Sequence, residues 1–368
     1  MNDVPTRIAF FLRSIGGGGA EGAMINLARG FAERGYKVDF VLGSASSPHL
    51  WRIPPEVKIV DLSAPSLPAS FNALKQYLRQ EQPIALLSAL HYSNEVAILA
   101  KRFSGVSTRV LVCEQNTLSQ RAKHDARLSG RLSPLAARLS YPLADVIVAI
   151  SNGVAEDLID ATGISSERIE VIYNPAIAPD IVTRSEEAID HPWFGPGQPP
   201  VILGVGKMEP QKDFPTLIRA FAQVRQTRPA KLVILGWGPE REQLEALAKE
   251  LGVEQDVSLP GYVKNPYPYM AKAAVFTLSS AWEGFGNVVA EALALGTPVV
   301  STNCRSGPSE ILNNGAYGYL TPVGDSSALA ESIGSVLSGN AKPIDPDWLE
   351  QFSIKAVTQH YCNALGIA

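Results

Sequence analysis

The chain alternates short apolar runs with longer segments of helical spacing, and this alternation limits its possible folds more than any other feature. Strands separated by helices of about 10–15 residues form βαβ units, which build a parallel sheet covered by helices. In the first half, the predicted strands are Ile8–Leu12, Val38–Leu42, Ala85–Ala89, Arg109–Cys113, Val146–Ile150 and Glu170–Ile172, and the predicted helices are Glu21–Arg34, Phe71–Gln80, Glu95–Phe103 and a helix capped by Ser151 that ends at Ala161.

Prolines between Pro175 and Pro200 interrupt this pattern, which then restarts. We therefore predict an N-terminal domain over residues 1–178, a linker over 179–199 and a C-terminal domain over 200–345. In the second half, the predicted strands are Pro200–Val205, Lys231–Leu235, Val257–Leu259, Val275–Leu278 and Pro298–Ser301, and the predicted helices are Phe214–Arg225, Glu240–Leu251, Tyr267–Ala273, Val288–Leu295, Ser326–Leu337 and Trp348–Leu365.

Composition narrows the class of protein. Of the 368 residues, 46% are hydrophobic and 18% charged, which predicts large cores, and the net charge of −4 gives no reason to expect nucleic acid. The three cysteines form no CxxC pair, so neither a disulfide framework nor a zinc site is indicated. No apolar run approaches the roughly 20 residues that span a bilayer, and the N-terminus enters a strand without a secretory signal. We expect a cytoplasmic α/β protein with two doubly wound halves and a ligand cleft between them.

The stretch from Ala281 to Glu291 carries two glutamates between a predicted strand and a predicted helix. Glu283 falls in the loop and Glu291 in the first turns of the helix. Gly284 and Gly286 let the backbone approach a ligand closely, and the helix N-terminus offers free N–H groups to an anion. The stretch suits a ligand that is anionic at one end and rich in hydroxyls at the other. The alternative is a glycine turn with two solvated glutamates.

A glycine loop, Gly16–Gly22, follows the first predicted strand and matches the dinucleotide fingerprint GxGxxG. That fingerprint also requires an acidic residue at the end of the second strand to hold a ribose. Here Asp39 lies near the start of that strand, so the NAD interpretation lacks its second anchor. Two interpretations remain. Either this is a glycine loop at a helix N-terminus whose backbone can approach a phosphate or a sugar, or it is an ordinary turn.

Two lysines, Lys207 and Lys212, lie in the loop after the strand Pro200–Val205. Fixed cations at the mouth of a parallel sheet can stabilise a leaving diphosphate, although two solvated lysines would leave the same pattern. The turns Gly236–Glu240 and Gly261–Val263 follow neighbouring strands, and they offer backbone polar groups and apolar surface to a nucleobase.

These residues together resemble the retaining glycosyltransferases of family 4, which have the GT-B fold. The similarity runs nearly end to end and rests on several short motifs in the same order. The motifs are Gly17-Gly18-Gly19-Ala20-Glu21, Ile150-Ser151-Asn152-Gly153-Val154, Val171-Ile172-Tyr173-Asn174-Pro175, Gly206–Asp213, the E-x7-E pair Glu283 and Glu291, and Ala294-Leu295-Gly296-Thr297-Pro298-Val299-Val300.

The resemblance implies two Rossmann-like doubly wound domains that face each other across a cleft, with a helix over about 348–366 crossing back onto the first domain. It implies that Glu283 contacts hydroxyls of a donor sugar, and that Lys207 and Lys212 bind its diphosphate; these three are the catalytic candidates. It implies no metal cofactor, and we attribute the DxD match Asp345-Pro346-Asp347 to chance. The implied donor-binding residues are Gly17, Gly18, Gly19, Gly206, Tyr262, Val263, Phe285, Gly286, Asn287, Val288 and Glu291, with Glu291 on the nucleotide ribose.

The chain also departs from the family pattern. Lys207 replaces the usual arginine, which keeps the charge but loses the bidentate fork, and Asp213 stands where the motif ends in glycine. A donor-site histidine common in the family is absent after Arg109–Cys113. Gln115 is predicted to take its place, and the acceptor-side candidates are His91, Gln115 and Asn116.

The predicted reaction moves a sugar from a UDP- or GDP-sugar to a hydroxyl of a saccharide or lipid-linked saccharide, with retention of configuration. A nucleotide-sugar epimerase of the same architecture, an NAD-dependent oxidoreductase and a non-catalytic sugar-nucleotide binder remain as alternatives. The basic run Arg121–Arg138 is interleaved with Leu128, Leu132 and Leu135. It indicates either peripheral contact with an anionic membrane at the inner face of the cell or a solvated basic segment.

Overall fold

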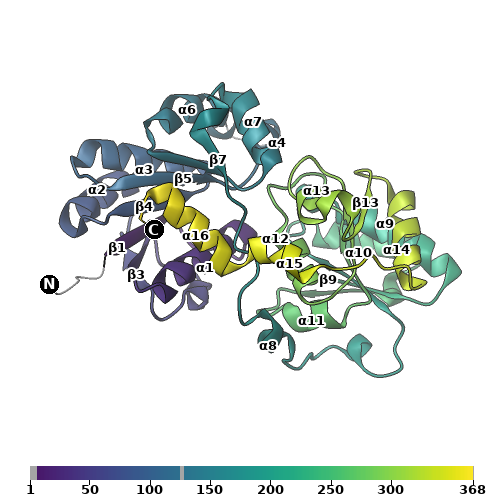
Figure 1. Cartoon of the computed structure of the whole chain (residues 1–368). Coiled ribbons are helices and arrows are strands. Elements are labelled where there is room, and N and C mark those ends of the chain that lie inside the picture. The colour runs from purple at the N-terminus through teal and green to yellow at the C-terminus, as the bar shows by residue number, and fades with distance from the viewer. Residues whose placement is uncertain (1–5, 125–127, 368) are drawn as a thin grey trace. The chain divides into compact units, whose positions relative to one another are not determined.

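The structure is a computed structural model that describes residues 6–124 and 128–367, and these form two compact units. The first unit contains the described residues up to Ala176 and from Gln351 onwards, and the second is Ile177–Glu350. Each unit is built on one parallel β-sheet with helices packed around it (Figure 1). Each unit is considered separately below.

The first unit has a seven-stranded parallel sheet in the order β3-β2-β1-β4-β5-β6-β7. Its inner strands are almost wholly buried, since helices cover both faces of a parallel sheet, and their sequences are therefore mostly apolar, with Asp39, Ser88 and Glu114 as buried polar exceptions. Its elements are β1 (Arg7–Leu12), α1 (Gly19–Glu33), β2 (Lys37–Leu42), η1 (Leu50–Arg52), β3 (Lys58–Asp61), α2 (Ser70–Glu81), β4 (Ala85–Ala89), α3 (His91–Ser104), β5 (Arg109–Glu114), α4 (Leu118–His124), α5 (Leu128–Arg131), α6 (Ser133–Ser140), η2 (Tyr141–Leu143), β6 (Val146–Ala149), α7 (Asn152–Thr162), η3 (Ser166–Arg168), β7 (Ile169–Val171) and α16 (Ile354–Leu365).

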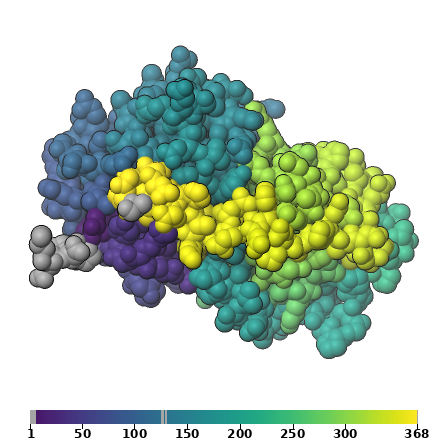
Figure 2. Space-filling view, viewed as in Figure 1, coloured from purple at the N-terminus to yellow at the C-terminus, as the bar shows by residue number. Residues whose placement is uncertain are grey.

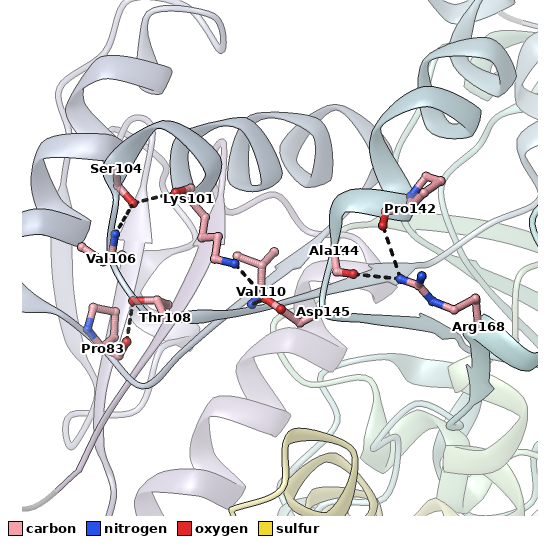
Figure 3. Close-up of polar contacts among 10 residues, drawn as sticks. All are labelled: Pro83, Lys101, Ser104, Val106, Thr108, Val110, Pro142, Ala144, Asp145 and Arg168. Atoms are coloured by element: carbon pink, nitrogen blue, oxygen red, sulfur yellow. Dashed lines mark hydrogen bonds and ion pairs between the residues drawn. The ribbon is translucent and has the colours of Figure 1, made fainter.

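Polar contacts connect the N-terminal ends of β4, β5 and β6 to one another (Figure 3). Asp145, just before β6, accepts a hydrogen bond of 2.7 Å from the backbone N–H of Val110 and lies 3.4 Å from Lys101 Nζ. Thr108 donates to the carbonyl of Pro83 at 2.6 Å, between the entries to β4 and β5. These contacts fix the entries of β4, β5 and β6 relative to one another.

Helix α16, at the end of the chain, packs against α1 near its start. In the space-filling view its yellow atoms lie directly over purple N-terminal residues (Figure 2). The contact is close because Gly30 of α1 has no side chain. A Cβ built there would overlap Thr358 Oγ1 and lie 2.9 Å from Ile354 Cγ2. Helices α1 and α16 therefore pack together, although they are far apart in the sequence.

The second unit has a six-stranded parallel sheet in the order β10-β9-β8-β11-β12-β13. A core of buried residues from α9, α14 and several strands covers one part of it. Its elements, together with η8 at the boundary, are α8 (Ile181–Ser185), η4 (Pro192–Phe194), β8 (Val201–Val205), η5 (Pro210–Lys212), α9 (Phe214–Thr227), β9 (Lys231–Leu235), α10 (Arg241–Glu250), η6 (Glu254–Asp256), β10 (Val257–Gly261), α11 (Tyr267–Lys272), β11 (Val275–Leu278), α12 (Asn287–Ala294), β12 (Val299–Thr302), α13 (Pro308–Ile311), η7 (Asn313–Gly315), β13 (Tyr319–Thr321), α14 (Ser326–Leu337), α15 (Pro346–Leu349) and η8 (Glu350–Phe352).

Both sheets reverse their strand order at one place, between β1 and β4 in the first unit and between β8 and β11 in the second. The loops that leave two such strands turn to opposite faces of the sheet and open a crevice at its carboxyl edge. Ligands of doubly wound proteins bind in this crevice. The three catalytic candidates, Lys207, Lys212 and Glu283, lie on the segments that follow β8 and β11.

Three local expectations need correction. The helix predicted to start at Glu95 starts at His91, because Leu90 takes a left-handed conformation (φ 70°) that ends β4 abruptly. The segment predicted as one helix over 348–366 is broken, since the Ser353 hydroxyl caps a new helix by accepting from Ala356 N. The proline-rich stretch expected to be a linker contains the short helix α8 and η4.

Candidate active site

The centre of the candidate site is an ion pair between Lys212 and Glu283 in the second unit. Lys212 Nζ lies 2.5 Å from Glu283 Oε1, and the two side chains are only 18% and 7% exposed. Burying two charges is costly unless they are paired and hydrogen-bonded. The fold nevertheless buries this pair at the switch point of a parallel sheet, where ligands bind.

Hydrogen bonds join the two loops that carry the pair. Ala281 N–H donates to the carbonyl of Gln211 at 2.8 Å, and the Gln211 side chain donates to the carbonyl of Trp282 at 3.0 Å. The Ser279 hydroxyl donates to the carbonyl of Lys212 at 2.8 Å. The loops after β8 and β11 therefore form one connected unit.

Glycines make the close packing of these loops possible. Gly206 lies under the aliphatic stem of Lys212, which a Cβ at Gly206 would meet at 3.2 Å. Gly236, after β9, has φ +138°, and a Cβ there would overlap the carbonyl oxygen of Gly206. Gly307, after β12, approaches the backbone of Phe285 in the same way. At Gly236 and Gly307 two backbones therefore pack directly against each other, and at Gly206 a backbone packs against a side chain.

The other predicted donor residues of this loop surround the N-terminus of α12. Phe285 is buried, and Gly286 caps α12 with φ 95°, a conformation that glycine adopts without strain. Asn287 and Val288 form the first turn, where backbone N–H groups can bind an anion. Glu291 lies in the next turn of α12 and is partly exposed.

Lys207 lies in the same loop as Lys212 but is oriented differently. Its Nζ is 5.7 Å from the centre of the Trp237 ring, and it has no ion pair with any residue in 6–124 or 128–367. Trp237 and Tyr262 follow the neighbouring strands β9 and β10 and are 48% and 40% exposed, with Val263 partly exposed beside them. Two exposed aromatic rings at a sheet edge offer surface to a flat ligand.

Asp213 explains one departure from the family motif. Its φ of 43° is the left-handed conformation that a glycine would adopt easily at this place. Aspartate tolerates this conformation, and its carboxylate caps α9 by accepting hydrogen bonds from Thr216 N and Oγ1. Asp345 of the DxD match is likewise a cap, because it accepts from Asp347 N and from the Tyr317 hydroxyl.

The glycine loop of the first unit has a carboxylate of its own chain beside it. Gly18 caps α1 and Gly19 begins it. A Cβ built at Gly18 would lie 2.5 Å from Glu21 Oε2. A built Cβ at Gly16 would lie 3.0 Å from the other oxygen of Glu21. Gly17 lies between them in the β1–α1 loop, so a phosphate approaching this loop would meet a negative charge.

The acceptor-side candidates gather at the carboxyl ends of β4 and β5, in the first unit. His91 is in the first turn of α3, not in a loop, and only 1% of it is exposed. The Gln115 amide is buried and exchanges two hydrogen bonds with the Asn174 amide, at 3.1 and 3.0 Å. Asn116 accepts from Thr117 N. The Gln115 geometry favours a structural role, since both ends of its amide are occupied.

Sequence reasoning missed a buried polar network beside these residues. Tyr141 donates to Glu114 Oε2 at 2.7 Å, and Asn94 donates to the Tyr141 hydroxyl at 3.0 Å. Burial raises the pKa of Glu114 to about 7, and burial also raises the pKa of Glu95 to about 7 against the opposing charge of Arg121. No motif could have revealed this network, because its members come from three separate elements.

No cluster of three or more metal-ligating side chains occurs in the described parts of the chain. In the same parts, none of the helices combines the length and apolarity needed to cross a membrane.

Comparisons with known proteins define the class. The family described as glycosyl transferases group 1 matches residues 185–347, and glycosyltransferase family 4 matches residues 17–176. The chain is 31% identical over 342 residues, 90% of each chain, to N-acetylgalactosamine-N,N'-diacetylbacillosaminyl-diphospho-undecaprenol 4-alpha-N-acetylgalactosaminyltransferase of Campylobacter jejuni. It is 32% identical over 231 residues, 60% of this chain and 61% of the relative, to lipopolysaccharide 1,6-galactosyltransferase of Salmonella typhimurium.

Solved structures agree on the fold. The lipopolysaccharide outer core galactosyltransferase WaaB in its apo form superposes with a TM-score of 0.73 at 25% identity, covering 98% of this chain and 99% of that one. Anabaena HepE in complex with UDP-glucose superposes with a TM-score of 0.80 at 20% identity, covering 98% of this chain and 100% of that one. At this identity the similarity supports the fold alone. The two parallel sheets and these similarities define a glycosyltransferase of the GT-B fold. The chain belongs to the retaining glycosyltransferases of family 4.

Proposed function

We propose that this glycosyltransferase moves a sugar from a nucleoside diphosphate sugar to a hydroxyl of a saccharide or lipid-linked saccharide, with retention of configuration. The observation that carries the proposal is the buried Lys212–Glu283 pair at the β8/β11 switch point. A cation and a carboxylate there match a donor with a diphosphate at one end and sugar hydroxyls at the other.

The proposed roles follow from charge and position. Lys212 and Lys207 bind the diphosphate and stabilise the negative charge that develops on it as the glycosidic bond breaks. The α12 N-terminus, at Gly286, adds backbone N–H groups to the same anion. Glu283 accepts hydrogen bonds from hydroxyls of the donor sugar, and Glu291 from the nucleotide ribose. The protein thus contributes positioning and electrostatic stabilisation.

Two further roles concern the nucleobase and the first unit. Tyr262 and Val263 cover the nucleobase beside Trp237. The loop Gly17-Gly18-Gly19 is the donor-binding candidate of the first unit, and any group that its backbone binds must tolerate the neighbouring carboxylate of Glu21. His91 and Asn116 belong to the acceptor side, where their position at the carboxyl edge of the first sheet supports a binding role.

The relatives guide the choice of substrates to test. The names of the Campylobacter and Salmonella proteins describe transfer of N-acetylgalactosamine and of galactose, the first to a diphospho-undecaprenol-linked saccharide. We therefore propose a UDP- or GDP-hexose or N-acetylhexosamine as donor, and a bacterial surface glycan or its lipid-linked precursor as acceptor.

The test begins with thermal-shift screening against UDP, GDP, ADP and their sugars, followed by a transfer assay with lipid-diphosphate-linked and lipopolysaccharide-core acceptors. Glu283→Gln and Lys212→Ala are each expected to abolish transfer. Each variant removes one charge of the pair, so its melting temperature should fall, but it should still fold. Lys272→Ala, at an exposed lysine of α11, is the matched control and should remain fully active. Full activity of either site variant contradicts the assignment. Donor consumption without any acceptor would instead indicate the epimerase alternative.

We also propose that the exposed face of α5, α6 and η2 in the first unit contacts an anionic membrane. Arg121 does not belong to this face, because its guanidinium lies 5.2 Å from the centre of the Tyr92 ring. Arg131 and Arg138 are exposed, and basic groups among exposed leucines are typical of helices that lie in a membrane interface. Arg127 lies outside the described residues. The exposed leucines are Leu128, Leu132, Leu135, Leu139 and Leu143.

Co-sedimentation with phosphatidylglycerol vesicles tests this surface. Binding should weaken with added salt and with Leu139→Ser, whereas Leu99→Ser, at an exposed leucine of α3, should bind like the wild type. Absence of salt-sensitive binding, or equal loss in both variants, contradicts the membrane proposal.

A further inference from the structure

Ser280 makes the second contact to the carboxylate of Glu283. Its hydroxyl donates to Glu283 Oε1 at 2.6 Å, and this is the oxygen that Lys212 Nζ approaches at 2.5 Å. Ser280 is completely buried, while Glu283 keeps 6% of its surface exposed. A buried hydroxyl and a partly buried cation therefore hold the same oxygen of one carboxylate.

This arrangement leaves the other oxygen for a ligand. Within the described parts of the chain, Glu283 Oε2 accepts no hydrogen bond. A carboxylate held by Lys212 alone could swivel, because a lysine ammonium on a flexible stem fixes no direction. A second donor on the same oxygen, from a short and buried side chain, restricts that rotation.

The Ser280 backbone is itself fixed by the sheet. Its carbonyl accepts a hydrogen bond of 2.6 Å from Thr302 Oγ1, and Thr302 is a wholly buried residue at the end of β12. The preceding residue, Ser279, holds the backbone carbonyl of Lys212. The two consecutive serines after β11 thus each hold one member of the ion pair by their hydroxyl groups. Ser279 donates to the backbone carbonyl of Lys212, and Ser280 donates to the side chain of Glu283.

We propose that Ser280 is a positioning residue that directs Glu283 Oε2 towards the donor sugar. The proposal rests on the proposed function, since it requires Glu283 to contact the sugar in the reaction. Ser280 itself touches neither donor nor acceptor. Its effect should appear in the rate of transfer rather than in the binding of the nucleotide, because UDP lacks the sugar that Glu283 contacts.

The test compares Ser280→Ala with Ser301→Ala. Ser301 is the matched control, since it is a wholly buried serine on the adjacent strand β12 whose hydroxyl donates to the Thr302 carbonyl at 2.9 Å rather than to Glu283. The probes are UDP for calorimetric binding, and UDP-N-acetylgalactosamine or UDP-galactose for transfer, whichever the transfer assay selects.

Ser280→Ala should lower kcat about 10- to 100-fold, the effect of losing one hydrogen bond to a charged group. The donor KM and the UDP Kd should stay within about threefold. Ser280→Cys keeps the size of the side chain but is a weaker donor, so its kcat should fall between those of wild type and Ser280→Ala. Ser301→Ala should leave kcat, KM and Kd within twofold.

Three outcomes would overturn the proposal. One is a Ser280→Ala enzyme with wild-type kcat while Glu283→Gln is inactive, a result that leaves the proposed function standing. Another is equal loss of UDP binding and of kcat in Ser280→Ala, which would show a purely structural role. The third is full activity of Glu283→Gln, which would refute the proposed function itself and this inference with it.

Discussion

Replacing Gly30 by alanine tests whether the α1–α16 contact holds the first unit together. The new methyl would overlap Thr358 Oγ1, lie 2.9 Å from Ile354 Cγ2 and lie 3.1 Å from Thr358 Cβ. Thr358 has no room to move, since it is fully buried and its hydroxyl donates to the Ile354 carbonyl at 2.6 Å. The two helices must therefore separate, or the threonine must leave its rotamer.

Two opposing effects set the magnitude. Overpacking a well-packed core costs about 1–3 kcal/mol, whereas alanine in a helix interior is favoured over glycine by about 1 kcal/mol. Because Thr358 is fixed, we place the cost in the upper half of its range and expect Gly30→Ala to lower the free energy of unfolding by about 1–2 kcal/mol. A unit of this size should then melt roughly 2–8 °C lower.

Calorimetry of the wild type and four variants measures this effect: Gly30→Ala, Thr358→Ala, the double variant and Gly334→Ala. Gly334→Ala is the matched control: Gly334 lies in helix α14 and an added Cβ meets nothing within 4 Å, so this variant should gain about 0.5–1 kcal/mol. Adding Thr358→Ala to Gly30→Ala should remove the overlap and give a favourable coupling of about 1 kcal/mol or more. The reasoning fails if Gly30→Ala is as stable as the wild type, or if the second substitution restores nothing.

Three further predictions concern other parts of the molecule. Gly236→Ala should abolish donor turnover, because its Cβ would overlap the Gly206 carbonyl; an active variant of normal stability would contradict this packing. Asp145→Ala should cost about 1–3 kcal/mol in thermal unfolding, since the buried Val110 N–H loses its acceptor; an unchanged melting temperature would show that water replaces it. Burial raises the pKa of Glu114 from 4.5 to about 7, so the folded state binds its proton more tightly. The contribution of Glu114 to stability should therefore fall as pH rises from about 4.5 through 7, by about 3 kcal/mol in full. Glu114→Gln should reduce the slope in urea titrations at pH 5 to 8, and the slope that remains should include the contribution of Glu95, whose pKa is also raised to about 7.

Buried strands with mostly apolar sequences were predictable to the residue. Ala85–Ala89, Lys231–Leu235 and Val275–Leu278 agree with β4, β9 and β11, because a strand buried on both faces has apolar residues at most of its positions. The edge strand β3 escaped prediction, since its residues are mostly exposed and only two of its four, Ile59 and Val60, are apolar. The strand β13, of three residues, is too short to leave a pattern.

Some features of the candidate site were likewise predictable from the sequence, and others were not. Motif spacing located Glu283, Lys207 and Lys212 on loops beyond strand ends, and the fold places Lys212 and Glu283 in contact. Spacing could not reveal which oxygen of Glu283 is held, nor that Ser280 holds it, because such details depend on side-chain rotamers set by packing. For Gln115, the sequence position suggests a contact with a ligand. In the structure its amide is hydrogen-bonded to Asn174, a partner 59 positions away that sequence spacing could not identify.

The Lys212–Glu283 pair does not need to break for the donor to bind. A lysine ammonium has three N–H donors, and the contact with Glu283 Oε1 uses one of them. The remaining two can contact a diphosphate while the carboxylate keeps the ammonium in place. An unpaired lysine would lose rotamer freedom on binding, at a cost of up to about 2 kcal/mol. Pairing Lys212 in advance reduces this cost, and Lys212 and Ser280 together hold Glu283 in the orientation proposed for contact with the sugar. In the proposed reaction the ion pair is thus a preorganised element rather than an inhibitory one.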